Sequence, residues 1–122
     1  MEIFWLILLD QAVKQGIMMT SQDVLLNPGI AFGWGREVNL VWLVLGLVLV
    51  WLVKRKYSDY RAANWIAAGG LSNQIDRLCR GGVVDYLSLS FLPTKFNLAD
   101  LMVLAGIIGL MYSLVYEDKN NL

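Results

Sequence analysis

The chain is 122 residues long, 57% of them apolar, and its mean hydropathy is +0.55. Soluble domains average about 45–50% apolar residues, so we expect one domain, residues 1–122, with lipid as its main solvent. Ten basic and ten acidic residues cancel, which argues against a nucleic-acid partner, and the absence of histidine excludes Ser-His and Cys-His nucleophile pairs and most catalytic zinc sites. The one cysteine, Cys79, cannot form an intrachain disulfide and is predicted to be a packed thiol.

Apolar segments predict an all-α membrane protein with four transmembrane helices, about Ile3–Met19, Val38–Val53, Arg61–Cys79 and Leu98–Tyr116. The acidic Glu2 and the lack of a basic region argue against a cleaved signal peptide, so we expect the first segment to remain in the protein. The second segment is the most uniformly apolar, although it is shorter than the about 20 residues of a full span. The third should face the other helices rather than lipid, because it carries Asn64, Asn73, Gln74 and Asp76.

The basic residues of the chain predict its orientation. The link between the second and third segments has one acid, Asp59, and four cations: Lys54, Arg55, Lys56 and Arg61. An excess of cations marks cytoplasmic loops, so we expect this link and both termini on the cytoplasmic side. Each of the other two connections contains a β-type run punctuated by glycine and proline, Asp23–Leu26 and Val83–Leu87, which predicts a small β element on the outer face.

Polar side chains gather toward the outer ends of the predicted helices. A charge in hydrocarbon costs on the order of 3 kcal/mol, so such residues are functional candidates. Four carboxylates, two asparagines and two cations converge there: Asp10, Asp76, Asp85, Asp100, Asn73, Asn97, Lys14 and Arg77. Two carboxylates held close together share one proton and can activate water for amide hydrolysis. We therefore predict a dyad, in which Asp100 is ionised near the positive end of the last helix and Asp85 is protonated.

Each of these residues also has a purely structural explanation. Two pairs have the spacing of an ion pair across one helical turn, Asp10 with Lys14 and Asp76 with Arg80. Asn97, followed three residues later by Asp100, has the pattern of a helix cap. Asp85 and Asn27 lie in turn-forming sequences. The structural explanations do not account for the gathering of several carboxylates at one membrane face.

Five sequence blocks resemble those of the lipoprotein signal peptidases (signal peptidase II), and they occur in the family's order over nearly the whole chain. The blocks are Asp10-Gln11-Ala12-Val13-Lys14, Asn27-Pro28-Gly29-Ile30-Ala31-Phe32-Gly33, Gly69-Gly70-Leu71-Ser72-Asn73-Gln74-Ile75-Asp76-Arg77, Gly82-Val83-Val84-Asp85-Tyr86 and Phe96-Asn97-Leu98-Ala99-Asp100. Any one block would be weak, whereas five in order on four matching segments are highly specific.

The resemblance implies a peptidase that cuts a lipid-modified prolipoprotein just before its diacylglyceryl cysteine, at the outer face of the bacterial inner membrane. It implies Asp85 and Asp100 as the catalytic aspartates, no metal or organic cofactor, membrane lipid as a partner and inhibition by globomycin-type cyclic peptides. In the family pattern, the positions that shape the pocket and support binding are Asn73, Asp76 and Arg77. Those that hold the polar network of the site are Asp10, Lys14, Asn27 and Asn97.

The chain departs from the family pattern in its short segment between Lys14 and Asn27, in Ser72, where the family usually has glycine, and in Pro28. A shortened member with a reduced outer β element is therefore predicted. Two alternatives stay open. One is a small four-helix transporter that exchanges protons through Asp10, and the other is a family scaffold that folds without cleaving its substrate.

Overall fold

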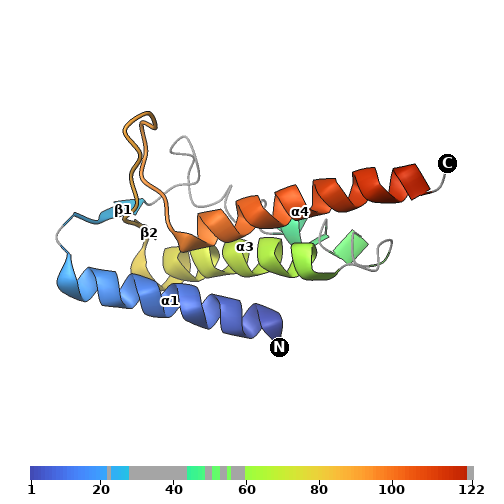
Figure 1. The fold of residues 1–122 in the computed structure, drawn as a ribbon. Coiled ribbons are helices and arrows are strands. Elements are labelled where there is room, and N and C mark those ends of the chain that lie inside the picture. The colour runs from blue at the N-terminus through green and yellow to red at the C-terminus, as the bar shows by residue number, and fades with distance from the viewer. Residues whose placement is uncertain (22, 28–43, 49–50, 53–54, 56–59, 121–122) are drawn as a thin grey trace.

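A computed structural model of the chain describes residues 1–21, 23–27, 44–48, 51, 52, 55 and 60–120. The elements are helix α1 (Glu2–Thr20), strand β1 (Leu25–Asn27), helix α3 (Tyr60–Arg80), strand β2 (Val83–Asp85) and helix α4 (Leu98–Asn120). In Figure 1, α1 and α3 run toward the end that carries the two strands, and α4 returns from it. The N-terminus and the C-terminal end of α4 therefore lie at the opposite end of the bundle from the sheet.

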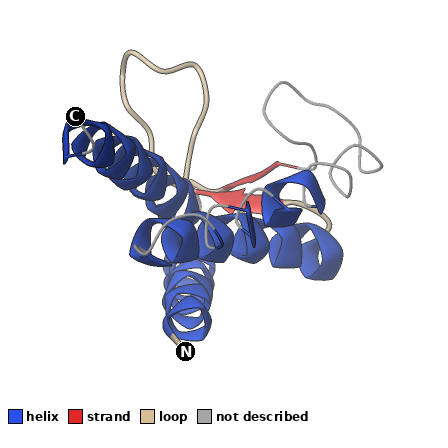
Figure 2. Cartoon of the chain, turned by 90° about the vertical axis from the view of Figure 1, so that its right-hand side faces the viewer, coloured by secondary structure: helices blue, strands red, loops and turns tan. Residues whose placement is uncertain are grey.

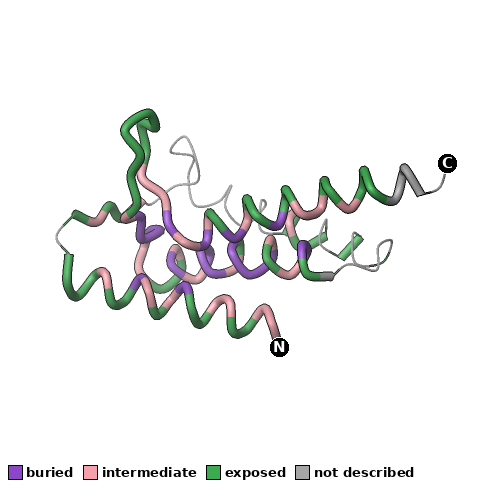
Figure 3. Tube along the Cα trace, in the orientation of Figure 1, coloured by how far each residue is buried: buried purple, intermediate pink, exposed green. Residues whose placement is uncertain are grey.

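Helix α3 is the centre of the bundle and packs against both α1 and α4. Small residues allow the neighbouring helices to approach α3 closely: Ala62, Ala63, Ala67 and Ala68 are buried, and Ala63 and Ala67 pack with Ile3 of α1. A side chain at Gly106 would place its Cβ 2.7 Å from the Ala62 carbonyl oxygen, so this crossing requires glycine. The purple, buried segments in Figure 3 accordingly follow α3 and β2.

The exposed faces of the helices carry many large apolar side chains, whereas several charged residues are buried. In α1 the buried residues are Asp10 and Lys14, while Phe4 and Trp5 are exposed. This is the reverse of a soluble helix, and it is the distribution expected where lipid surrounds the bundle. Within the described ranges, one helix is long and apolar enough to cross a membrane, Leu98–Tyr116 in α4, with a mean hydropathy of 2.1.

The sheet is a two-stranded antiparallel pair in which Leu25 lies opposite Asp85 and Asn27 opposite Val83. Gly81 follows the last residue of α3 with φ of 78°, a left-handed conformation that glycine adopts without steric cost, and it turns the chain from α3 into β2. After β2, Leu87 pairs with Phe96, which closes a hairpin of residues 86–97 between β2 and α4. The chain order thus brings the ends of α1, β2 and α3 to the start of α4.

The structure confirms the predicted helices that it describes, with small changes at their ends. The first and third begin and end one residue beyond the predicted limits, and α4 continues four residues beyond the predicted Tyr116, to Asn120. Residues 44–48, 51 and 52 of the predicted second helix are helical, and its remaining residues lie outside the described ones. The structure thus confirms a mostly helical fold with a small sheet. That four helices cross the membrane stays a prediction.

Two predictions need correction. The first strand is Leu25–Asn27 rather than Asp23–Leu26, because Asp23 is held by Lys95 outside the ladder and Asn27 pairs with Val83. The thiol of Cys79 is exposed rather than packed. In a lipid-surrounded bundle an apolar side chain loses nothing by facing outward, so the usual tendency of free cysteine to be buried does not apply.

Candidate functional site

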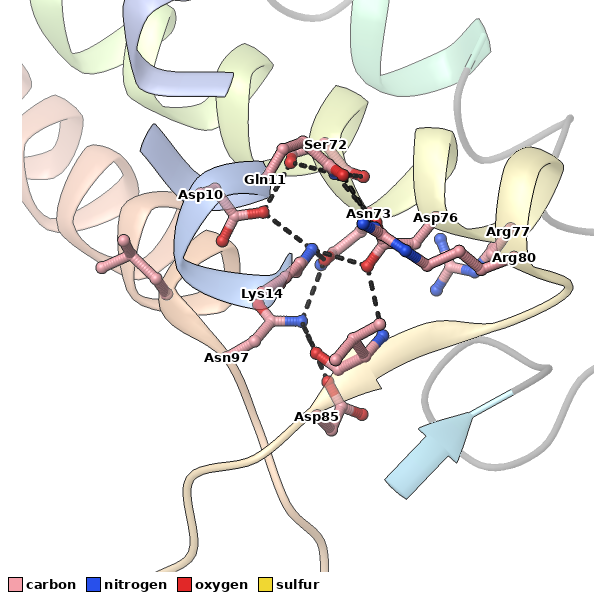
Figure 4. Close-up of polar contacts among 12 residues, drawn as sticks. Asp10, Gln11, Lys14, Ser72, Asn73, Asp76, Arg77, Arg80, Asp85 and Asn97 are labelled. Atoms are coloured by element: carbon pink, nitrogen blue, oxygen red, sulfur yellow. Dashed lines mark hydrogen bonds and ion pairs between the residues drawn. The ribbon is translucent and has the colours of Figure 1, made fainter. Parts of the chain in front are cut away.

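Asp85 and Asp100 come together at the sheet end of the bundle, joined by one residue. Asp85 ends β2, and Asp100 lies in the first turn of α4. Between them, the Asn97 side-chain Nδ2 donates a hydrogen bond to Asp85 Oδ1 at 2.9 Å, and the Asn97 backbone N–H donates to Asp100 Oδ2 at 3.0 Å. The two carboxyl groups therefore share a neighbour that fixes each of them, as Figure 4 shows for Asn97 and Asp85.

The helix cap that the sequence predicted is present. The Asp100 backbone N–H donates to Asn97 Oδ1 at 2.9 Å, which makes the bond from Asn97 N–H to Asp100 reciprocal. The cap leaves the second oxygen of Asp100 available, and that oxygen accepts a hydrogen bond from Asn73 Nδ2 at 3.0 Å. Capping and membership of the polar site are therefore two properties of the same carboxylate.

Asn73 connects the two aspartates to the charges buried deeper in the bundle. Its Oδ1 accepts from Lys14 Nζ and from Asn97 Nδ2, each at 3.0 Å. With its Nδ2 on Asp100, both ends of the Asn73 amide are occupied. The amide orientation is thus set by its neighbours, and α3 is tied through one side chain to α1 and to the start of α4.

A buried ion network lies behind the aspartate pair. Lys14 Nζ lies 2.7 Å from Asp10 Oδ2 and 2.7 Å from Asp76 Oδ2, and all three side chains are fully buried. Asp76 also accepts from Arg80 at 2.6 Å and from the Val84 backbone N–H at 3.1 Å. Buried charges are tolerated when they are paired and hydrogen-bonded. Asp76 therefore holds α1, α3 and β2 in register, and both predicted ion pairs are present.

The electrostatic environment of Asp85 favours its protonated form. Asp85 is only 4% exposed. Burial first, and the charge of Asp100 second, raise the pKa of Asp85 from 3.8 to about 6, against the lowering effects of hydrogen bonds from Asn97 and Asn27 and of the Lys14 charge. A carboxyl group with a pKa near 6 can hold and release a proton under mild conditions.

Tyr86 joins the end of β2 to the first turn of α4. Its hydroxyl oxygen accepts a hydrogen bond from the Leu98 backbone N–H at 3.1 Å, and its own N–H donates to the Phe96 carbonyl at 3.0 Å. Burial, and after it the nearby carboxylate charges, raise the pKa of the Tyr86 hydroxyl. Because Tyr86 follows Asp85 directly, these bonds restrict how far the two aspartates can separate.

Most residues that the sequence singled out belong to one connected network: Asp10, Lys14, Asn73, Asp76, Asp85, Asn97 and Asp100. Asn27 reaches it through its hydrogen bond to Asp85. Arg77, on the same end of α3, donates to Gln74 Oε1 at 3.4 Å. Within the described ranges, no group of three or more His, Cys, Asp or Glu side chains is placed to hold a metal ion.

The sequence assigned no role to two residues that the network uses. Gln11 Nε2 donates to Ser72 Oγ at 2.9 Å and to Asp76 Oδ1 at 2.8 Å, and Ser72 Oγ donates to Asp10 Oδ2 at 2.5 Å. The sequence signal that could have singled out Gln11 and Ser72 was their polarity within predicted membrane helices. Asp10 Oδ2 accepts a hydrogen bond from Ser72 and pairs with Lys14, whereas the transporter alternative requires a lone acid.

Comparisons with known proteins agree on one family. The family model of signal peptidase (SPase) II matches residues 3–116. The lipoprotein signal peptidase of Streptococcus pneumoniae is 32% identical over 141 aligned residues, covering 97% of this chain and 92% of the relative. That of Caldanaerobacter subterraneus subsp. tengcongensis is 33% identical over 99 residues, covering 75% of this chain and 68% of the relative. A bacterial membrane enzyme structure obtained by the in meso method at 2.3 Å resolution has a similar fold, with a TM-score of 0.79 and 24% identity over 98% of this chain and 88% of that one.

Proposed function

The chain belongs to the signal peptidase II family, and from this premise we propose that it is an aspartyl endopeptidase. Its substrates are diacylglyceryl-modified prolipoproteins, from which it removes the signal peptide, and Asp85 and Asp100 are its catalytic residues. The single observation that supports this most strongly is the bridge through Asn97, whose side chain bonds to one carboxyl group and whose backbone bonds to the other.

The two aspartates divide the proton transfers between them. Asp100, ionised, takes a proton from a water molecule whose oxygen attacks the scissile carbonyl carbon. Asp85, protonated, donates its proton to the carbonyl oxygen, which gives a neutral tetrahedral intermediate. When the C–N bond breaks, the amine takes the proton that Asp100 received, and an intermediate hydroxyl returns a proton to Asp85. The products are a free carboxyl group and a free amine, and both aspartates regain their starting states.

The buried network supports this division because it holds the site without joining the proton transfers. Asp76 accepts bonds from Lys14, Arg80 and a backbone N–H, so it is engaged on both oxygens. Asp85 and Asp100 accept bonds from neutral asparagine amides and backbone groups instead. A cation beside a carboxylate favours its ionised form, so such a group is a poor proton donor. Burial and the charge of Asp100 instead raise the pKa of Asp85 to about 6, so this group can carry a proton.

We place the sheet end at the outer face of the bacterial inner membrane and both termini in the cytoplasm, with the chain crossing the membrane four times. Apolar residues on the outward faces of α1 and α4 support a bundle in lipid, and the cation-rich link at residues 54–61 supports the orientation. The aspartates then lie where the cleavage site of a membrane-anchored substrate arrives. A globomycin-type cyclic peptide, which occupies the same end of the bundle, is expected to inhibit cleavage.

The experiment that tests this function is cleavage of a diacylglyceryl-modified prolipoprotein by the purified protein and by Asp85→Asn and Asp100→Asn. Each variant should lose cleavage while retaining its helical content and cooperative unfolding. Asp23→Asn is the matched control, since the Asp23 side chain is 88% exposed and lies outside the network, and it should cleave as the wild type does.

Two outcomes would refute the proposal. Full cleavage by Asp85→Asn or by Asp100→Asn would show that the replaced aspartate is not catalytic. Binding of the substrate or of a globomycin-type ligand by the wild type without any turnover would identify the chain as a family scaffold that does not cleave.

A further inference from the structure

We propose that the hairpin of residues 86–97 inserts its apolar tip into the outer leaflet of the bilayer beside α4 and thereby holds the aspartate pair at the lipid boundary. This inference rests on the proposed placement of the bundle in a membrane. It concerns the stretch of chain that links the two aspartates, and the proposed catalytic steps do not use it.

The tip of the hairpin is apolar and uncharged. Residues 86–94 contain no Asp, Glu, Lys or Arg, and Leu87, Leu89 and Phe91 alternate with two serines. A hydrogen bond of 3.0 Å from the Leu92 N–H to the Leu89 carbonyl closes the turn at the tip. A loop that extends into water normally carries polar and charged residues, so this composition requires an apolar neighbour.

The part of the chain that the structure describes does not cover this tip. Phe91 is 78% exposed, Leu89 is 44% exposed and Leu92 is 43% exposed. In Figure 3 the tip is coloured as exposed, in contrast to the buried segments of β2 and α3. Three large apolar side chains on one turn are therefore left exposed by the described residues.

The direction of the hairpin identifies the neighbour as lipid. In Figure 1 the hairpin leaves the sheet end at a steep angle to the helix axes, and in Figure 2, turned by 90°, it again projects sideways from the bundle. The bilayer normal follows the helix axes, so the hairpin extends along the membrane plane. The exposed apolar face of α4, including Leu101, Leu104 and Ile108, begins directly after it in the chain and continues the same apolar surface into the bilayer.

The neck of the hairpin is polar, as an anchor at the interface requires. Lys95 Nζ donates to the Asp23 backbone carbonyl at 3.0 Å and forms an ion pair with the Asp23 carboxylate. These bonds tie the neck to the segment before β1, whereas the tip is exposed. Interfacial amphipathic helices bury their apolar faces about 5–10 Å into the boundary between headgroups and acyl chains, and we expect a comparable depth for this tip.

The test is a depth measurement by spin labelling in lipid nanodiscs, on a Cys79→Ser background. Labels are placed singly at Leu89→Cys and Phe91→Cys in the tip, with Ile108→Cys as the lipid reference and Ser21→Cys as the water reference. Collision with oxygen, which concentrates in lipid, and with a water-soluble nickel chelate gives the depth of each label. Both tip labels should resemble the lipid reference, with oxygen collisions at least threefold above those of the water reference and chelate collisions correspondingly lower.

Two results would overturn the inference. Tip labels that collide with the chelate as freely as the water reference would place the hairpin in solution. Tip labels shielded from both probes, with shielding lost on dilution into empty nanodiscs, would assign the tip to a second copy of the chain. Neither result depends on cleavage. If the tip lies in water and cleavage still requires the aspartates, the proposed function stands and the insertion of the hairpin is wrong. If the tip lies in lipid and the aspartates are not required for cleavage, the insertion stands and the proposed catalytic pair is wrong.

Discussion

Replacement of Asp85 by asparagine should stabilise the folded protein at alkaline pH while abolishing its activity. Burial and the charge of Asp100 raise the pKa of Asp85 from 3.8 to about 6, so between these values the folded protein holds a proton that the unfolded chain has lost. The stability contributed by this protonated carboxyl is fully present below pH 3.8 and is lost as the pH rises through about 6. At pH 8 the wild type folds with an ionised, buried Asp85, and asparagine removes that cost.

The size of the effect follows from the same two values. A pKa of about 6 in place of 3.8 corresponds to about 3 kcal/mol in the free energy of unfolding. The stability difference between Asp85→Asn and the wild type should therefore be about 2 kcal/mol more favourable to the variant at pH 8 than at pH 4, where the unfolded chain has already lost part of this proton. The comparison of two pH values cancels any constant effect of the substitution, such as an altered hydrogen bond to Asn97.

Unfolding in detergent micelles at both pH values measures this difference. Asp23→Asn is the control, because the Asp23 side chain is 88% exposed and lies outside the buried network. If the advantage of Asp85→Asn were the same at pH 4 and pH 8, Asp85 would titrate as an ordinary surface acid. The inference of a proton held at the site would then be wrong.

Three further predictions concern the groups around the pair. Asn27→Ala removes a hydrogen bond that lowers the pKa of Asp85, so the alkaline limb of the pH profile of kcat/KM should move upward by about one pH unit, and an unmoved limb would show that this bond does not act on the catalytic acid. Lys14→Met leaves two buried carboxylates without their shared cation and should cost about 3–5 kcal/mol in the free energy of unfolding, whereas a cost below about 1 kcal/mol would mean that water enters the network. Gly106→Ala should destabilise the bundle by about 1–3 kcal/mol, because its Cβ would lie 2.7 Å from a carbonyl oxygen of α3. Gly70→Ala is the control and should be neutral or stabilising, because its Cβ would have nothing within 4 Å. Equal effects of the two substitutions in thermal unfolding would contradict the packing of α3 on α4.

The helices could be predicted closely because their signals are local. The apolar run that starts at Leu98 and the cap formed by Asn97 and Asp100 mark the start of α4, and both depend only on neighbouring residues. Gly81 marks the end of α3 in the same way. The predicted strand began two residues before the observed Leu25–Asn27 and ended one residue before it, because the strand limits depend on pairing with β2, which is distant in the chain.

The residues of the site could be predicted, whereas their contacts could not. Family blocks and intramembrane polarity were sufficient to single out Lys14 and Asp76, and spacing predicted the pair of Lys14 with Asp10, but it did not predict a second bond from Lys14 to Asp76. The structure shows that Lys14 bonds to both Asp10 and Asp76. The roles of Gln11 and Ser72 depend on the angle at which α1 crosses α3, which no local pattern specifies.

The exposure of Cys79 could not be predicted from soluble-protein experience. Burial frequencies for free cysteine reflect water as the solvent, and in lipid the outward face of a helix is as favourable for a thiol as the interior. The same reversal explains why α1 buries Asp10 and Lys14 and exposes its aromatic residues. Solvent, rather than propensity, therefore determines which face of each helix is the inner one.

The most direct test of the aspartate pair is the pKa of Asp85, measured by carboxyl carbon NMR in the wild type and in Asp100→Asn. Loss of the Asp85 resonance in Asp85→Asn assigns it. Asp100 raises the pKa of Asp85 by its charge, so the value should be about 6 in the wild type and distinctly lower in Asp100→Asn. An identical pKa in the two proteins would show that the carboxyl groups do not interact, and the proposed proton sharing would be contradicted.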